Sequence, residues 1–216
     1  PSSIDASHFR KARNITEDPK DQAHIPHPRL GFFGVIDERF DIQLLDQVAT
    51  MRPDWNFVVI GPVVKIDPAT LPSHPNIYYL GAKKYQELPE YLAGWDISIM
   101  LFARNESTRF ISPTKTPEYL AAGKPVISTS IRDVVRPYGE LKLVEIADTA
   151  DEFIHAAEKI MSQSSQYEWL ARVDTFLQDV SWDKTWAQMS ALIDSVIDAR
   201  RPSRSRRRSS RTDGIV

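Results

Sequence analysis

The sequence predicts an α/β fold, in which helices cover both faces of a doubly wound parallel sheet of about six strands. Two observations support this prediction. Short apolar runs, several of them ended by glycine, recur along residues 29–146, and segments with apolar residues at helical spacing lie between them. Strands that alternate with helices run in parallel, because each helix returns the chain to the end of the sheet where the previous strand began.

The apolar runs place the strands. Asn56–Ile60 is rich in Val, Ile and Phe and is followed by Gly61-Pro62, which is typical of a strand buried on both faces. The predicted strands are Arg29–Gly34, Asn56–Ile60, Asn76–Leu80, Asp96–Phe102, residues 125–128 and Leu141–Ile146.

Capping residues and helical spacing place the helices. Asp41 is a good N-cap for a helix that runs to Met51, and Gly94 ends a helix over Tyr85–Ala93. The other predicted helices are Thr114–Ala122, Thr149–Met161, Ser165–Leu177 and Trp182–Ala199. The last of these has an aromatic face, which we expect to pack on this domain or on a further domain.

Composition and charge limit the possible functions. Hydrophobic residues make up 42% of the chain, enough for a sizeable core, and the absence of cysteine excludes disulfides and thiol nucleophiles. No apolar run is long enough to span a membrane. Residues 1–199 carry 20 basic and 28 acidic residues, which argues against a dedicated nucleic-acid-binding domain. These features are compatible with a cytoplasmic location, including one at the inner face of the membrane.

The composition also predicts the boundaries of the domain. We expect residues 1–28 to be an interdomain linker and residues 29–199 to form the α/β domain. Residues 200–216 contain seven Arg and one Asp, so this Arg- and Ser-rich tail should be disordered. The tail is either solvated without a partner or in contact with an anionic membrane surface.

The segment from residue 112 to residue 129 reads as a loop, a short helix and a buried strand. Pro117 has no backbone N–H and therefore fits only the first turn of a helix. This places the cap at Thr114 or Thr116, both good N-cap residues. Gly123 ends the helix, and Pro125 prevents its return.

Two charged residues, Lys115 and Glu118, gather at the start of this helix. A helix N-terminus and a Lys attract an anion such as a phosphate, and a Glu can accept hydrogen bonds from two ribose hydroxyls. Either residue alone is more often a solvated surface charge or a charge favoured by the helix dipole. Together they predict a nucleotide site.

The motif Pro-x-Lys-x-x-Glu-Tyr-x-Ala-Ala-Gly-Lys-Pro-Val-Ile, which starts at Pro113, resembles the donor-site segment of GT-B glycosyltransferases with two Rossmann-like domains. The resemblance is closest to retaining enzymes of group 1, family 4-like, that build bacterial surface polysaccharides. Residues 1–9 resemble the segment that joins the N-terminal to the C-terminal domain in that family. The resemblance implies a donor-binding C-terminal half, a nucleoside diphosphate sugar as donor, a missing N-terminal acceptor-binding domain and no metal or other cofactor.

The resemblance also implies site residues. By analogy with the family, Glu118 would bind the donor ribose and the segment 82–85 would lie near the nucleobase. The helix N-terminus and nearby basic residues would hold the diphosphate. The implied donor-binding residues are Glu118, Lys115, Thr114, Thr116, Gly34, Arg39 and Gly61. The chain departs from the family pattern at Val35, where an Arg is usual, and at Phe110, where relatives often have a Glu that contacts the sugar. No catalytic residue is assigned.

Two alternatives stay open on the sequence. The first is an isomerase on the same scaffold, a nucleotide-sugar 2-epimerase, although we find no array of acid and base residues for it. The second is a nonenzymatic nucleotide-binding module, which Val35 and Phe110 weakly favour. The five histidines show no metal-ligand spacing, and neither a dinucleotide fingerprint nor a phosphate loop is present.

Overall fold

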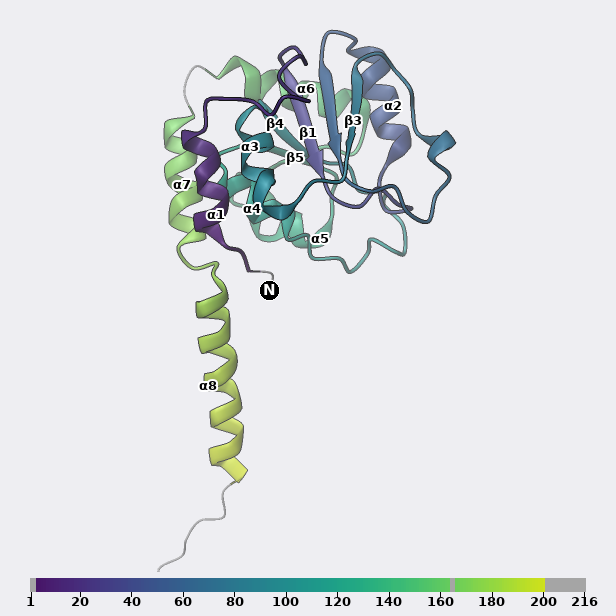
Figure 1. Ribbon diagram of the computed structural model, residues 1–216. Coiled ribbons are helices and arrows are strands. Elements are labelled where there is room, and N and C mark those ends of the chain that lie inside the picture. Colours follow the sequence, from purple (N-terminus) through teal and green to yellow (C-terminus); the bar gives the residue numbers. More distant parts are fainter. Residues whose placement is uncertain (1–2, 164–165, 201–216) are drawn as a thin grey trace, which may run out of the picture.

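The computed structural model describes residues 3–163 and 166–200, and its centre is a six-stranded parallel sheet (Figure 1). The strand order is β3-β2-β1-β4-β5-β6, which confirms the predicted doubly wound α/β fold. The strands are β1 Arg29–Phe33, β2 Asn56–Ile60, β3 Ile77–Gly81, β4 Ile97–Met100, β5 Val126–Ser128 and β6 Glu145–Ile146. The last strand is much shorter than predicted, because Lys142 has a positive φ of 53° and turns the chain just before it.

Helices cover both faces of this sheet. The described helices are α1 Ala6–Arg10, α2 Ile42–Met51, α3 Leu88–Ala93, α4 Lys115–Ala121, α5 Arg132–Val134, α6 Ala150–Ser162, α7 Tyr167–Leu177 and α8 Trp182–Arg200. Single helical turns occur at Lys11–Asn14, Pro68–Thr70, Tyr85–Glu87 and Val135–Gly139. The prediction missed α1, α5 and the turns that follow them, because they are too short to show a helical period.

Capping side chains explain where two of the helices begin. Asp41 caps α2, since its carboxylate accepts a hydrogen bond from the Leu44 N–H at 2.9 Å. Thr149 caps α6 in the same way through the Glu152 N–H. The sequence therefore determines these helix starts locally.

Two apolar cores lie on opposite faces of the sheet. One packs α2 and α6 against the sheet, with Phe57 and Phe153 fully buried. The other packs α1, α3, α4 and α7 against the second face, around Trp95 and Tyr119. The chain reverses its direction of winding between β1 and β4, so the carboxyl ends of these neighbouring strands form the crevice where such folds bind ligands.

Residues 3–28 pack onto the domain instead of lying apart from it. Phe9 is fully buried beside Phe33, and Ile4 and Ile25 are also in the core. The fold therefore uses residues before position 29, where the sequence predicted the domain to begin. Whether this segment also links two domains stays a prediction.

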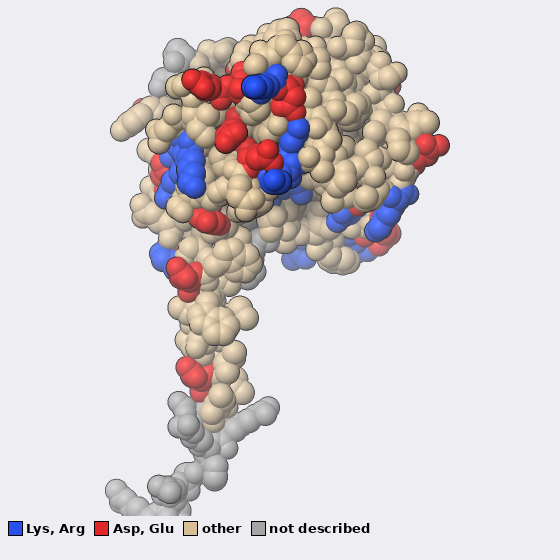
Figure 2. All heavy atoms as spheres, viewed as in Figure 1, with Lys and Arg blue, Asp and Glu red and all other residues tan. Residues whose placement is uncertain are grey.

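The final helix, α8, projects away from the body (Figure 1). Figure 2 shows mostly uncharged side chains along it. Trp182 and Trp186 are 60% and 67% exposed, so the expectation that this face packs on the present domain is wrong. Packing on a further domain stays a prediction. The predicted disordered tail lies outside the described residues, apart from Arg200.

Candidate functional site

The candidate site lies at the carboxyl end of β1, where the side chain of Lys115 crosses the backbone of Gly34. A Cβ atom on Gly34 would lie 2.2 Å from the Lys115 Cε and 2.8 Å from its Nζ. Gly34 also has a φ of +147°, which L side chains rarely adopt. Gly34 is therefore required for the Lys115 ammonium to reach the crevice. The ammonium lies 5.9 Å from the centre of the Phe32 ring.

Gly61 packs directly against the backbone of Gly34. A Cβ atom on Gly61 would lie 1.7 Å from the carbonyl oxygen of Gly34, and the Gly34 N–H donates to the Ile60 carbonyl at 2.8 Å. The loops that follow β1 and β2 can approach this closely only because residue 61 is a glycine. The structure thus gives Gly61 a role in shaping the site.

Lys115 and Glu118 bring two half-buried, opposite charges to the crevice from the first turn of α4. Burial raises the pKa of Glu118 to about 7, against the opposing effect of the Lys115 charge. Burial likewise lowers the pKa of Lys115, while Glu118 acts in the other direction. Among the described side chains neither residue has an ion-pair partner within 4.0 Å. Both charges are therefore available to a ligand.

Arg39 reaches the same crevice already paired. Its Nε lies 3.0 Å from each carboxylate oxygen of Asp37, whose side chain is almost fully buried. The Arg39 guanidinium holds the pKa of Asp37 below its usual range. Val35, where the family has a second Arg, is 40% exposed. This loop therefore offers a phosphate one cation, and that cation is largely neutralised.

The two threonines of the motif have different places. Thr114 is the N-cap residue of α4 and is exposed, but its side chain makes no capping hydrogen bond. Thr116 is fully buried, and its hydroxyl points to the Met100 sulfur at 3.5 Å. The side chain of Thr116 thus faces the core and is not available to a ligand in the crevice. Because α4 has only seven residues, its dipole adds little beyond the two charged side chains.

Tyr119 fixes α4 to the sheet. Its hydroxyl, which is fully buried, accepts a hydrogen bond from the Phe33 N–H at 3.0 Å. The two rings also pack edge to face, with centres 4.9 Å apart. This contact holds the first turn of α4, and with it Lys115 and Glu118, against the end of β1.

Sequence reasoning missed an aromatic wall beside Glu118. Tyr85 is 43% exposed and close enough for the Glu118 charge to help raise the pKa of its phenol, after burial. His8 stacks on Tyr85 with ring centres 4.5 Å apart, and its Nε2 lies 2.9 Å from the Tyr85 carbonyl oxygen. The sequence predicted that the segment 82–85 lies near a nucleobase. It could not predict the contribution of His8, because His8 and Tyr85 are 77 positions apart in the chain.

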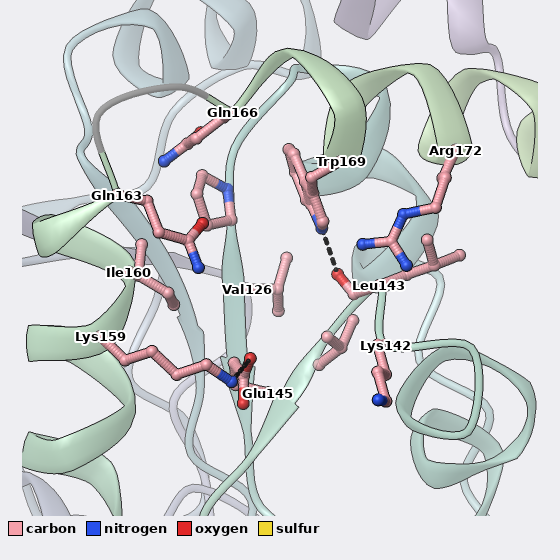
Figure 3. Close-up of a pocket in the computed structure, with 12 residues that line it drawn as sticks. Val126, Lys142, Leu143, Glu145, Lys159, Ile160, Gln163, Gln166, Trp169 and Arg172 are labelled. Atoms are coloured by element: carbon pink, nitrogen blue, oxygen red, sulfur yellow. Dashed lines mark hydrogen bonds and ion pairs between the residues drawn. The ribbon is translucent and has the colours of Figure 1, made fainter.

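A pocket of about 170 Å³ lies at the opposite end of the sheet (Figure 3). Val126 and Glu145, at the amino ends of β5 and β6, line it together with Trp169 of α7. The Trp169 indole donates to the Leu143 carbonyl at 3.2 Å, and Lys159 pairs with Glu145 at 2.7 Å. This pocket contains none of the predicted site residues.

Several ionisable groups meet in the crevice without forming a metal site. No group of three His, Cys, Asp or Glu side chains is placed to hold a metal ion in the part of the chain that the structure describes. The donor set instead consists of one free ammonium, one half-buried carboxylate and an aromatic wall. This arrangement suits an organic anion that carries hydroxyl groups.

Comparison with solved structures identifies the class of fold. The chain matches a sucrose-phosphate synthase from Thermosynechococcus elongatus with a TM-score of 0.66 and 14% identity, covering 92% of this chain and 52% of the other. It matches Anabaena HepE, solved with UDP and glucose, with a TM-score of 0.65 and 14% identity, covering 89% of this chain and 55% of the other. The fold is therefore that of a Rossmann-like domain of GT-B glycosyltransferases.

Sequence comparison identifies the family. The family model for glycosyl transferases group 1 matches residues 27–163. Over 141 residues the chain is 33% identical to TuaH of Bacillus subtilis (strain 168), which is named as a teichuronic acid biosynthesis glycosyltransferase. The match covers 62% of this chain and 35% of TuaH. The chain belongs to the glycosyl transferases group 1 family.

These findings confirm the predicted fold and the family resemblance, and they support neither of the two alternatives. The chain spans about a third of the length of TuaH and about half of the solved structures that it matches. The predicted roles of individual site residues, the linker and the absence of a cofactor stay predictions.

Proposed function

We propose that this chain is the donor-binding domain of a glycosyltransferase that uses a nucleoside diphosphate sugar. The observation that carries the proposal is the placement of Lys115 and Glu118. They are half-buried at the carboxyl end of β1, three residues apart, and make no ion pair with each other. Leaving two such charges unpaired is costly for folding, which favours a role in binding.

Each charge has a distinct chemical role in this proposal. The Lys115 ammonium faces the diphosphate and stabilises the negative charge that grows on it as the glycosidic bond breaks. The Glu118 carboxylate accepts hydrogen bonds from the two ribose hydroxyls, and the base lies against Tyr85. Arg39 adds a weaker electrostatic contribution, because Asp37 neutralises it. Because Gly34 and Gly61 have no side chains, the diphosphate can approach the backbone closely.

Most of the groups that bind the acceptor would come from a second domain. The relatives are two to three times the length that this chain covers in them, which supports a two-domain enzyme. The exposed apolar face of α8 would then pack on that second domain. We expect residues 1–216 to bind nucleotide but not to transfer sugar efficiently without it.

The name of TuaH supports a role in the synthesis of an acidic polysaccharide. No helix in the described ranges is long and apolar enough to cross a membrane. We propose a cytoplasmic enzyme that acts near the inner face of the membrane, where nucleotide sugars and membrane-bound acceptors meet. Contact of the Arg-rich residues after position 199 with anionic lipid would support this location.

A calorimetric screen of UDP, GDP, dTDP and ADP against the chain tests the proposal. The best nucleotide is then titrated into Glu118→Gln and into Glu90→Gln as a control, since Glu90 is exposed and has no partner among the described residues. Hydrogen bonds to a charged group are worth about 1.5–3 kcal/mol, so Glu118→Gln should weaken binding by about one to two orders of magnitude. Equal affinities of the two variants, or no binding of any nucleotide, would refute the assignment.

A further inference from the structure

A depression at the carboxyl edge of the sheet carries positive charge that the proposed nucleotide contacts do not use. It has a volume of about 600 Å³ and lies between the loop that follows β4 and the residues that follow β5. Arg104, Arg109 and Arg132 line it, against one acidic residue, Glu106. This excess stands out because residues 1–199 carry 28 acidic and only 20 basic residues.

Hydrogen bonds fix the two walls of the depression. The Thr129 hydroxyl, just after β5, donates to the Phe102 carbonyl at 2.8 Å and accepts from the Phe102 N–H at 3.0 Å. In the other wall, Thr108 is 1% exposed and its hydroxyl donates to the Asn105 carbonyl at 3.1 Å. The depression is therefore preformed by its backbone.

Two of the three guanidinium groups, those of Arg109 and Arg132, are open to a ligand. Arg132 is exposed and has no ion-pair or hydrogen-bond partner among the described residues. Arg109 lies 3.6 Å from Glu106, in a pair whose side chains are 62% and 87% exposed. Arg104 lies 3.0 Å from Asp148, and its side chain is 56% exposed. The pair of Arg109 with Glu106 is solvent-exposed and therefore weak, so an incoming oxyanion can compete for Arg109. Asp148 is only 22% exposed and also accepts hydrogen bonds from Ser130, so its pair with Arg104 is held more firmly.

The position of the depression matches the sugar end of the proposed donor. Along the carboxyl edge the strand order runs β3, β2, β1, β4, β5. Tyr85 follows β3, Lys115 lies over the end of β1, and the depression follows β4 and β5. A nucleoside diphosphate sugar has its base, ribose, diphosphate and sugar in a row, so the sugar points toward the β4–β5 side. Neighbouring strands are about 4.8 Å apart, so the depression is within reach of that sugar.

The pictures agree with this placement. α5, whose first residue is Arg132, lies at the lower edge of the sheet, on the side where β1 ends (Figure 1). Basic side chains, interleaved with acidic ones, gather along the lower margin of the body in the same view (Figure 2).

We propose that the depression lined by Arg104, Arg109 and Arg132 binds an oxyanion, a carboxylate or a phosphate, on the sugar of a glycosyl substrate. The planar guanidinium fork matches both groups with two parallel hydrogen bonds. This inference rests on the proposed function and adds a substrate class to it, acidic sugars. The sugar that carries the oxyanion belongs either to the donor or to the acceptor. The experiment has one arm for each of these two substrates.

The donor arm compares UDP-glucose with UDP-glucuronate, or the equivalent hexose and hexuronate of whichever nucleotide binds best. The chain should bind the hexuronate about tenfold more tightly, the lower end expected for hydrogen bonds to a charged group at an exposed site. The acceptor arm titrates glucose 6-phosphate, glucuronate and glucose into the chain saturated with UDP. A preference for the two acids over glucose would identify the acceptor as the source.

Arg109→Gln/Arg132→Gln should abolish the preference in the arm that shows it and leave the affinity for UDP within about twofold. Arg172→Gln is the matched control, because Arg172 is exposed, has no partner among the described residues and lies at the opposite end of the sheet (Figure 3). This control should keep the preference. No preference in either arm, or a preference that survives the double substitution, would overturn the inference.

Failure of the proposed function gives a different result. In that case no nucleotide binds, and the acceptor probes are titrated without UDP. Binding of glucose 6-phosphate that the double substitution removes would still support the oxyanion site, and its absence would reject it.

Discussion

Glu118→Gln should stabilise the ligand-free domain while it weakens nucleotide binding. Burial raises the pKa of Glu118 from an ordinary value of 4.5 to about 7. A carboxyl group with a raised pKa in the folded state costs stability as pH increases, because folding then has to bury a charge. This cost is absent below about pH 4.5 and complete above about pH 7.5.

The pKa shift sets the size of the effect. A shift of one pKa unit corresponds to about 1.4 kcal/mol, so the full difference is about 3 kcal/mol. The substitution also removes an anion that favours charged Lys115, and the site is partly solvated, so we expect about 2 kcal/mol. For a domain of this size 1 kcal/mol shifts Tm by about 2–4 °C, which gives a rise of about 4–8 °C at pH 8.

Thermal melts of wild type, Glu118→Gln and the exposed control Glu90→Gln at pH 5 and pH 8 measure this effect. The two variants should differ little at pH 5, and Glu118→Gln should melt several degrees higher at pH 8. A lower Tm of Glu118→Gln at pH 8 would show that Glu118 serves the fold, and the reasoning from an unpaired functional charge would be wrong.

Three further predictions test the structure. Gly61→Ala should lower Tm by about 6 °C or more, because its Cβ would lie 1.7 Å from a backbone oxygen. The control Gly81→Ala places no atom within 4 Å of its Cβ, so it should cost only about 1–2 kcal/mol of backbone strain. Trp186→Ser should leave Tm of this chain within about 2 °C, because the side chain is 67% exposed, whereas Trp169→Ser should lower it by removing a packed indole and its hydrogen bond. Deletion of residues 201–216, which hold two large apolar residues, should leave Tm unchanged in calorimetry, and a drop of many degrees would show that they dock on the body.

The sequence by itself determined the architecture. Runs such as Asn56–Ile60 and the cap at Asp41 depend on neighbouring residues, so periodicity and capping located most of the strands and helices within a few positions. The start of β6 was misplaced, because a backbone turn at Lys142 has no signal in the hydrophobic pattern. The motif around Glu118 likewise pointed to the correct family, because it is contiguous in the chain.

Only the tertiary structure decided which side chains face the crevice. It turned Thr116 into the core, paired Arg39 with Asp37 and used Gly61 to support Gly34. It also brought Tyr85 beside Glu118. The physical reason is that such contacts join residues from different strands and loops, so they depend on how the sheet edge is packed and not on the spacing of residues along the chain.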